Sequence, residues 1–385
     1  MYFILLLYLL FLYFYYDVLG KKGYQKLNLY LSCMLLILVA GFRYRIGVDT
    51  IKYMEDFKYY PTLDKLNLSL LDVEPFWLLI NSVCKTLYDD FVLVQLVQAA
   101  IVNIIIFWFI KRHSPKPFLA ILLYYVFQWW NFCFEVMRES ISIAFYLYAL
   151  DAILAQNNWK KYYLRIWPAL LVHTFGFVTL LFPFIQLLKF RKSTLGIFAI
   201  LIVLAFTSST QLNTIIFLFD GSIADKVNYY LDSNIYGGSS ISIMGILAYF
   251  LGNVLPILII LYIFYKYRQI ERISRIVPYL LIFLLIIILR IQVTIFYRFF
   301  NYFEIIVIVA MTQLVSLSSL RQNRNFRYLT LFALILMSSF KIYQFYKPAV
   351  DYNKNAKIYH RYYPYNSVFN KEYHQETEWI FRQKR

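Results

Sequence analysis

Apolar segments that are long enough, or nearly long enough, to cross a membrane recur along almost the whole chain. A helix needs about 20 predominantly apolar residues to span the hydrocarbon core of a bilayer. A backbone in that core must satisfy its own hydrogen bonds, which a helix does within each segment. We therefore expect an all-α, polytopic integral membrane protein with about 10–12 transmembrane helices. The expected segments are Tyr2–Tyr16, Asn28–Phe42, Phe91–Ile110, Pro117–Phe134, Ser140–Ala155, Tyr162–Leu188, Thr194–Leu212, Ile241–Phe264, Val277–Phe296, Phe299–Leu317 and Tyr328–Tyr346.

The composition excludes an ordinary soluble protein. Hydrophobic residues make up 61% of the 385 residues and charged residues 15%, whereas a soluble chain carries about 25% charged residues. The net charge of +17 does not indicate a nucleic-acid partner, because the basic residues stand in short clusters between apolar segments, as in cytoplasmic loops. Cys33, Cys84 and Cys133 show no metal-ligand spacing, so we expect no metal centre.

The basic clusters predict the topology. Placing all of them in the cytoplasm gives a consistent count if Glu74–Leu87 lies at the membrane surface or re-enters, and both termini then face outward. We expect a single transmembrane domain over residues 1–346, with outer loops at 43–75 and 213–240 and a short outer tail at 347–385. The run Tyr162–Leu188 is too long for one span, which favours a hairpin or re-entrant segment with His173 near its tip. The clusters are Lys21/Lys22/Lys26, Lys111/Arg112/Lys116, Lys160/Lys161/Arg165, Lys189/Arg191/Lys192, Lys266/Arg268/Arg272/Arg275 and Arg321/Arg324/Arg327.

Several arginines remain on the predicted outer side, against the positive-inside tendency. Arginine is always charged and grips phosphate with two parallel hydrogen bonds, so a bound anion explains their position. The alternatives are snorkelling to lipid headgroups and, for Arg290, an internal ion pair. The predicted anion-binding residues are Arg43, Arg45, Arg138, Arg290 and Arg298.

Three further residues on that side are candidates for proton transfer: Asp49, Glu74 and His173. Each also has a simpler interpretation. Asp49 can serve as a turn or cap residue, Glu74 before Pro75 is typical of a helix start, and a lone histidine in an apolar run is usually a packing residue. Proton transfer by His173 requires a neutral imidazole, whose ordinary pKa of about 6.5 suits that role.

The outer residues together resemble the EpsG/Wzy-type family of bacterial polysaccharide polymerases. The resemblance runs from about residue 40 to 370, but outside the motifs it is one of hydropathy only. Where that family often has Arg-Gln, this chain has Arg138-Glu139, which leaves the charge balance of that site open. The matching motifs are Phe42-Arg43-Tyr44-Arg45-Ile46-Gly47-Val48-Asp49-Thr50 with Tyr53, Glu74-Pro75-Phe76-Trp77, Arg138, His173, Arg298 to Tyr302, and Tyr363-Pro364-Tyr365-Asn366-Ser367.

The resemblance implies the fold of C-type integral-membrane glycosyltransferases and a defined reaction. Such enzymes transfer the growing glycan from undecaprenyl pyrophosphate onto the next lipid-linked repeat unit, at the outer face of the bacterial inner membrane. The expected partners are the undecaprenyl-pyrophosphate-linked oligosaccharide, membrane lipids and a chain-length regulator protein, with no cofactor. The arginines would form a pyrophosphate clamp, with Asp49, Glu74 or His173 as base. Tyr53, Trp77 and Tyr302 could stack on sugars, although packing is the commoner role of aromatic residues in such a chain.

Other functions stay open at this point. A flippase for lipid-linked oligosaccharide also needs cationic residues, but along a path that reaches both faces of the membrane. The predicted arginines lie on one side, which favours an enzyme over a transporter. An O-antigen ligase or a membrane acyltransferase is the alternative among enzymes. The sequence lacks GxxxxGK[ST], HExxH, GxSxG and SxxK motifs, which argues against an ATPase, a zinc protease and a serine hydrolase.

Overall fold

The computed structural model describes residues 1–66, 74–188, 196, 243–292, 296–320, 324–348 and 357–371. Every regular element in these ranges is helical, and β-type pairing there is confined to two isolated bridges, Arg43–Ser367 and Pro348–Lys357. The predicted span Thr194–Leu212, the outer loop 213–240 and much of the tail lie outside the described residues. The α-helices are α1 (Tyr2–Leu12), α2 (Gln25–Gly41), α3 (Val48–Phe57), α4 (Pro75–Leu87), α5 (Phe91–His113), α6 (Pro117–Tyr124), α7 (Met137–Gln156), α8 (Trp159–Val172), α12 (Ile243–Tyr249), α13 (Leu255–Lys266), α14 (Glu271–Gln292), α15 (Phe296–Leu320) and α16 (Arg324–Tyr346).

Short π- and 3-10-helical segments extend or connect these helices. The π-helical segments are η1 (Tyr13–Val18), η4 (Tyr125–Trp129), η5 (Asn131–Glu135) and η7 (Phe250–Val254), and the 3-10 segments are η2 (Leu63–Lys65), η6 (Thr174–Leu187) and η8 (Ile358–Arg361). The apolar helix that begins at Pro117 thus continues through two π-helical segments and ends at Glu135. Such segments widen the helix and are frequent at functional sites.

Five helices of the described ranges, all from Phe91 onward, are long and apolar enough to cross a membrane, which confirms the predicted all-α, polytopic membrane fold. The helices that are long and apolar enough to cross a bilayer are Phe91–His113, Leu247–Lys266, Glu271–Arg290, Phe296–Leu317 and Arg324–Tyr346. Shorter apolar helices cover Tyr2–Val18, Gln25–Gly41, Pro117–Trp129 and Thr174–Leu187.

The chain forms two compact units. Unit 1 comprises Met1–Pro183 and Ile342–Arg385, and unit 2 comprises Phe184–Lys341. A single transmembrane domain over residues 1–346 stays a prediction.

Local sequence signals explain where the helices of unit 1 begin and end. The Asp90 carboxylate accepts a hydrogen bond from the Val92 backbone N–H at 3.0 Å and caps α5. Pro75 occupies the first position of α4, where a backbone N–H would have no partner within the helix, so its absence costs no hydrogen bond. Asn157 ends α7 in the left-handed conformation, and the side chain of Asn158 caps α8. The α7–α8 connection is therefore a two-asparagine turn.

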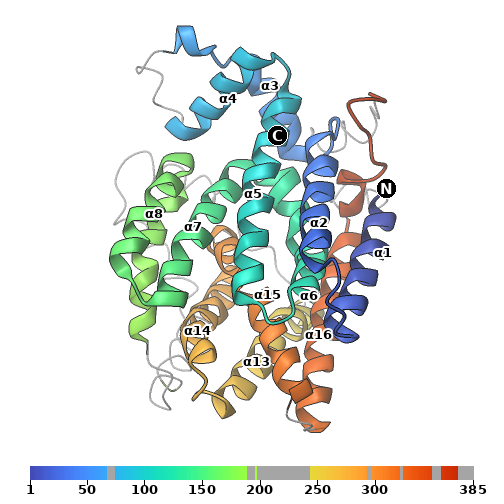
Figure 1. Ribbon diagram of the computed structural model, residues 1–385, viewed down its shortest axis with the longest axis vertical. Helices are drawn as coiled ribbons and strands as arrows, with labels where there is room; N and C mark the ends of the chain where they lie inside the picture. The colour runs from blue at the N-terminus through green and yellow to red at the C-terminus, as the bar shows by residue number, and fades with distance from the viewer. Residues whose placement is uncertain are drawn as a thin grey trace. The chain divides into compact units, whose positions relative to one another are not determined.

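One end of unit 1, here called the loop end, brings the first loop and the tail together. The Val368 N–H donates to the Phe42 carbonyl at 2.9 Å, and the Tyr44 N–H donates to the Asn366 carbonyl at 2.9 Å. Helices α3 and α4 lie at the same end, beyond α5 (Figure 1). The loop and this part of the tail therefore share one side, as their predicted topology requires. That this side faces outward stays a prediction.

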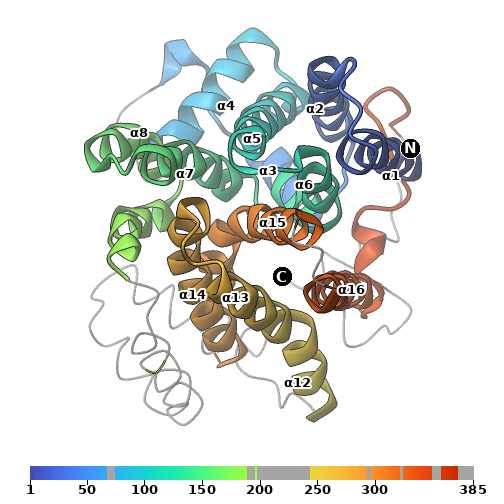
Figure 2. The same cartoon turned by 60° about the horizontal axis from the view of Figure 1, so that its bottom comes forward.

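The segment that follows Asn158 folds back on itself, as predicted for the long apolar run. The Tyr162 hydroxyl donates to the Thr179 carbonyl at 2.6 Å, and a Cβ on Gly176 would lie 2.4 Å from the Ala169 carbonyl oxygen. Helix α8 and the 3-10 segment η6 therefore run antiparallel. His173 lies at the break between them, in extended backbone. Helices α7 and α8 lie side by side, as Figures 1 and 2 both show.

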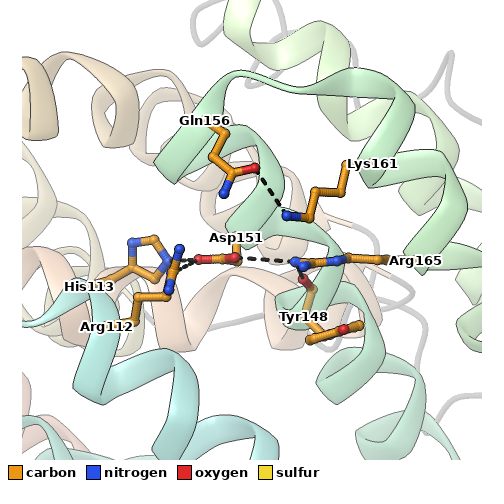
Figure 3. Close-up of polar contacts among 7 residues, drawn as sticks. All are labelled: Arg112, His113, Tyr148, Asp151, Gln156, Lys161 and Arg165. Carbon is orange, nitrogen blue, oxygen red and sulfur yellow. Dashed lines mark hydrogen bonds and ion pairs between the residues drawn. The ribbon is translucent and has the colours of Figure 1, made fainter.

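The opposite end of unit 1, here called the basic end, is held by one buried carboxylate. The Asp151 side chain is 2% exposed and pairs with Arg112 and His113 at the end of α5 and with Arg165 on α8 (Figure 3). The Asp151 oxygens lie 3.0 Å from His113 Nε2 and 3.2 Å from Arg165 Nη1. The Arg165 guanidinium also covers the Tyr148 ring at 4.4 Å. Asp151 thus ties α5, α7 and α8 together.

The shared side of the first loop and the tail can be tested by cysteine labelling. Cys33, Cys84 and Cys133 are buried, so they can be replaced by alanine to give a clean background. In spheroplasts, a membrane-impermeant maleimide should label exposed Lys65→Cys and Asn370→Cys without permeabilisation. The exposed Lys160→Cys control at the basic end should react only after permeabilisation. Protection of either loop-end site in unpermeabilised spheroplasts would contradict the topology.

The second prediction concerns Asp151. Replacing Asp151 with asparagine leaves the cations around it without their shared counter-charge, and breaking a buried pair from one side costs about 3 kcal/mol or more. The purified Asp151→Asn protein should unfold at a clearly lower temperature than the wild type. The fully exposed Asp64 provides the control, since Asp64→Asn should leave the unfolding temperature unchanged. Equal temperatures for the two variants would show that Asp151 is not a structural link.

Candidate functional site

The first loop reaches the turn before α7 because Gly47 has no side chain. Gly47 adopts a φ of +92°, and a Cβ there would lie 2.4 Å from the Phe134 carbonyl oxygen. That oxygen accepts a hydrogen bond from the Thr50 hydroxyl at 2.6 Å. The Gly47 N–H donates to the Arg361 carbonyl at 3.1 Å. The loop is therefore clamped between the end of η5 and the tail.

Arg43 is fully buried inside this loop. Its guanidinium donates to the Ala40 carbonyl and, at 2.9 Å, to the Thr50 hydroxyl, and it covers the Phe134 ring at 4.8 Å. All of these contacts hold the loop to its surroundings. We therefore assign Arg43 to anchoring the loop, and its predicted contact with an anion stays a prediction.

Three predicted site residues from different helices do meet at the loop end. Arg138 Nη1 lies 2.6 Å from a Glu74 carboxylate oxygen, and the Arg138 guanidinium covers the Tyr53 ring at 5.4 Å. The Tyr53 ring in turn packs edge-on against Trp77 at 5.5 Å between centroids. The Arg138 side chain remains 32% exposed, although its Nε atom is buried and has no hydrogen-bond partner among the described residues. Arg138 can therefore bind an anion at an accessible position.

A carboxylate that the sequence did not point to lies beside this group. Glu135, the last residue of η5, is 8% exposed, and its Oε2 accepts a hydrogen bond from the Asp49 N–H at 3.2 Å. Its Oε1 has no hydrogen-bond partner among the described residues. Burial raises the pKa of the Glu135 carboxyl above its usual value, the charge of Arg361 opposes this, and Asp49 adds to it. Glu135 is thus a buried carboxyl with one unused oxygen.

Helix α3 contacts both of these charged groups. The Asp49 N–H in its first turn donates to Glu135, and the Tyr53 ring lies under the Arg138 guanidinium. Glu135 and Arg138 therefore both lie against α3.

The remaining predicted residues of unit 1 lie in different settings. Arg45 is half-buried in the first loop, with a φ of +53°. His173 is buried at the break between α8 and η6, where its ring stacks on Phe175 at 5.8 Å between centroids. The roles that we predicted for Arg45 and His173 stay predictions.

Unit 2 holds the other predicted arginines. The Arg290 guanidinium lies 4.6 Å from the Phe300 ring centre and 4.8 Å from that of Tyr297. Arg298 is half-buried in the first turn of α15, whereas Tyr302 is buried at 1% exposure, which favours packing over sugar stacking. Unit 2 thus offers cations on α14 and α15, and their role in anion binding stays a prediction.

Two charged features are absent from the predictions made on the sequence. Glu135 follows an apolar run directly and precedes Arg138, so an ionisable residue at a span end was the available signal. Lys341 of α16 lies 3.5 Å from a Glu304 oxygen within unit 2, a pairing between helices far apart in sequence that local patterns do not reveal. Within the described residues, no group of three or more His, Cys, Asp or Glu side chains could hold a metal ion.

Comparison with known proteins gives one match. The chain matches the EpsG family over residues 26–367, which covers most of its length. The comparisons with curated proteins and with solved structures found no match. The family match includes the first loop, Glu74, Glu135, Arg138 and the tail as far as Ser367.

The third prediction tests the close approach of Gly47. Alanine at this position is strained by the positive φ and collides with the Phe134 carbonyl, so Gly47→Ala should destabilise the protein by about 3 kcal/mol or more. Gly20 is the matched control, because it also has a positive φ but a Cβ added there would meet nothing within 4 Å. Gly20→Ala should cost only about 1 kcal/mol. Similar thermal unfolding of the two purified variants would contradict the clamped loop.

Proposed function

The chain belongs to the EpsG family, and from this premise we propose that it is a polysaccharide polymerase. It transfers a growing glycan from undecaprenyl pyrophosphate onto the next lipid-linked repeat unit at the outer face of the bacterial inner membrane. Its direct partner is the lipid-linked oligosaccharide, and a chain-length regulator is a candidate protein partner.

One observation carries this proposal. Several of the segments with which the sequence resembles polysaccharide polymerases, those around Arg43, Glu74, Arg138 and Asn366, are far apart in the chain, yet in unit 1 they meet at the loop end. The first loop contacts the tail at Asn366, and Glu74 pairs with Arg138. A structural framework alone does not need a partly exposed arginine and a buried carboxylate with a free oxygen at one place. Their meeting supports a reaction site.

The groups at the loop end suit displacement of a pyrophosphate. An acceptor hydroxyl attacks the anomeric carbon of the donor glycan, and the bond from that carbon to the pyrophosphate oxygen breaks. Negative charge develops on the departing pyrophosphate, where preorganised donors stabilise it. Arg138 is the best-supported donor, because its ion pair with Glu74 engages Nη1 while its side chain remains 32% exposed.

Arg45, Arg290 and Arg298 remain proposed members of the clamp. Glu74 holds Arg138 in place before the substrate arrives, and a pyrophosphate then competes with that carboxylate for the same guanidinium. Tyr53 supports Arg138 from one face. Glu74 thereby acts as a positioning residue in this proposal.

Deletion of the gene tests the function directly. The surface glycan of the deletion strain should carry a single repeat unit on its anchor, and the plasmid-borne wild type should restore the full ladder. Loss of the repeat unit altogether would indicate a flippase. An unchanged ladder in the deletion strain would exclude a polymerase role.

The fourth prediction compares two arginines in similar surroundings. Arg138 and Arg165 each pair with a carboxylate and each lie over a tyrosine ring. Arg138→Ala should lower polymerisation at least tenfold, because a lost charge-assisted contact costs about 1.5–3 kcal/mol. Arg138→Lys should rescue poorly, since lysine lacks the planar fork.

Arg165→Lys is the control at the basic end and should give a full glycan ladder at normal membrane abundance. Complementation of the deletion strain measures both variants side by side. A full ladder from Arg138→Ala at wild-type abundance would rule out a clamp at this position.

A further inference from the structure

We propose that Glu135 is the catalytic base, the group that accepts the proton of the attacking sugar hydroxyl. This inference rests on the proposed function and goes beyond it, because no motif of the resemblance includes Glu135. The sequence predicted Asp49, Glu74 or His173 for this role. At the loop end, Glu135 is better placed for this role than the carboxylates of Asp49 and Glu74.

The burial of Glu135 is the first observation behind the proposal. Its Oε2 accepts the Asp49 N–H, whereas Oε1 has no hydrogen-bond partner among the described residues. A buried polar oxygen left unpaired destabilises a protein, so native structures seldom retain one without a use. An incoming hydroxyl that donates to Oε1 supplies the missing partner.

The surroundings also suit a proton acceptor. A carboxylate in water is a weak base, whereas a buried one binds a proton more readily. Burial raises the pKa of Glu135, and the positive charge of Arg361 from the tail opposes that rise. The Asp49 N–H holds one oxygen and thereby orients the other.

The other two carboxylates are less suited to this role. Glu74 is already engaged in its ion pair with Arg138 at 2.6 Å. Asp49 lies in the first turn of α3, and its N–H is the group that binds Oε2 of Glu135. His173 belongs to the α8–η6 hairpin and not to the cluster around α3.

The placement of Glu135 fits the reaction as well. Glu135 accepts the Asp49 N–H of α3 and Arg138 covers the Tyr53 ring of the same helix, so the proton acceptor and the pyrophosphate donor both lie against α3. The hydroxyl oxygen forms a bond to the anomeric carbon and its proton passes to Oε1 of Glu135. The bond to the pyrophosphate oxygen breaks, and its electron pair leaves with the pyrophosphate that Arg138 binds.

The experiment compares Glu135→Gln with wild type in membranes and in complemented cells. The substrate probe is the lipid-linked repeat unit extracted from the deletion strain. A general base contributes about 100-fold or more to the rate, so Glu135→Gln should lower polymerisation at least 100-fold. Its binding of the probe should stay within about threefold of wild type and its unfolding temperature should be unchanged, because glutamine keeps the size of the side chain and its accepting oxygen.

Two further variants complete the design. Glu135→Asp keeps a carboxylate and should retain measurable activity, at least tenfold above Glu135→Gln. Glu55→Gln is the matched control, a half-buried carboxyl on α3 outside the site, and it should polymerise at the wild-type rate. If Glu135→Gln does not fold, the Asp variant decides: a folded protein slowed more than tenfold supports the proposal, and wild-type activity overturns it.

The outcomes separate the base from the proposed function. Wild-type activity in Glu135→Gln overturns the assignment of Glu135 while the polymerase function stands. Loss of probe binding or of thermal stability in proportion to activity overturns it as well, since Glu135 would then be structural. If the wild type itself fails to extend the repeat unit, the proposed function fails, and the assignment of Glu135 fails with it.

Discussion

The contact between the first loop and the turn before α7 is the constraint on which the loop end depends. A loop that leaves a membrane helix can adopt many conformations. Here one of them is selected, because Gly47 has no side chain and its backbone can approach the Phe134 carbonyl closely. The buried guanidinium of Arg43 then fixes the loop from inside, through Ala40 and Thr50. A permanently charged group is costly to bury, so the loop is held where a carbonyl oxygen of Ala40 and the hydroxyl oxygen of Thr50 face that charge.

Everything that we assign to chemistry is built on this framework. The loop delivers the start of α3, and α3 presents Asp49 to Glu135 and Tyr53 to Arg138. The tail closes the arrangement from the other side through its backbone contacts with Phe42 and Tyr44. The site is therefore assembled mainly by main-chain hydrogen bonds and packed rings. Two of its charged side chains, Arg138 and Glu135, each keep one atom without a hydrogen-bond partner among the described residues.

The sequence predicted the membrane fold, the folding back at His173 and several residues of the candidate site, because each leaves a local signal. Hydropathy marks helices of membrane length, and the pair Glu74-Pro75 marks a helix start. The sequence could not distinguish Arg43 from Arg138, since burial depends on tertiary packing. Glu135 escaped notice for the same reason: a carboxylate at the end of a span looks solvent-exposed until the Asp49 N–H is found beside it. The shared carboxylate at Asp151 joins three helices, which no local pattern encodes.

The position of Asp151 in the chain bears on how the protein is made. Arg112 and His113 end α5, and Asp151 follows only after α6 and most of α7 have been synthesised. While α5 enters the membrane, its terminal cations therefore carry their full charge and can hold that end on one side of the membrane. Once α7 is in place, the same cations meet Asp151 and become part of the packed structure. One set of residues can thus direct insertion first and lock the inserted helices afterwards.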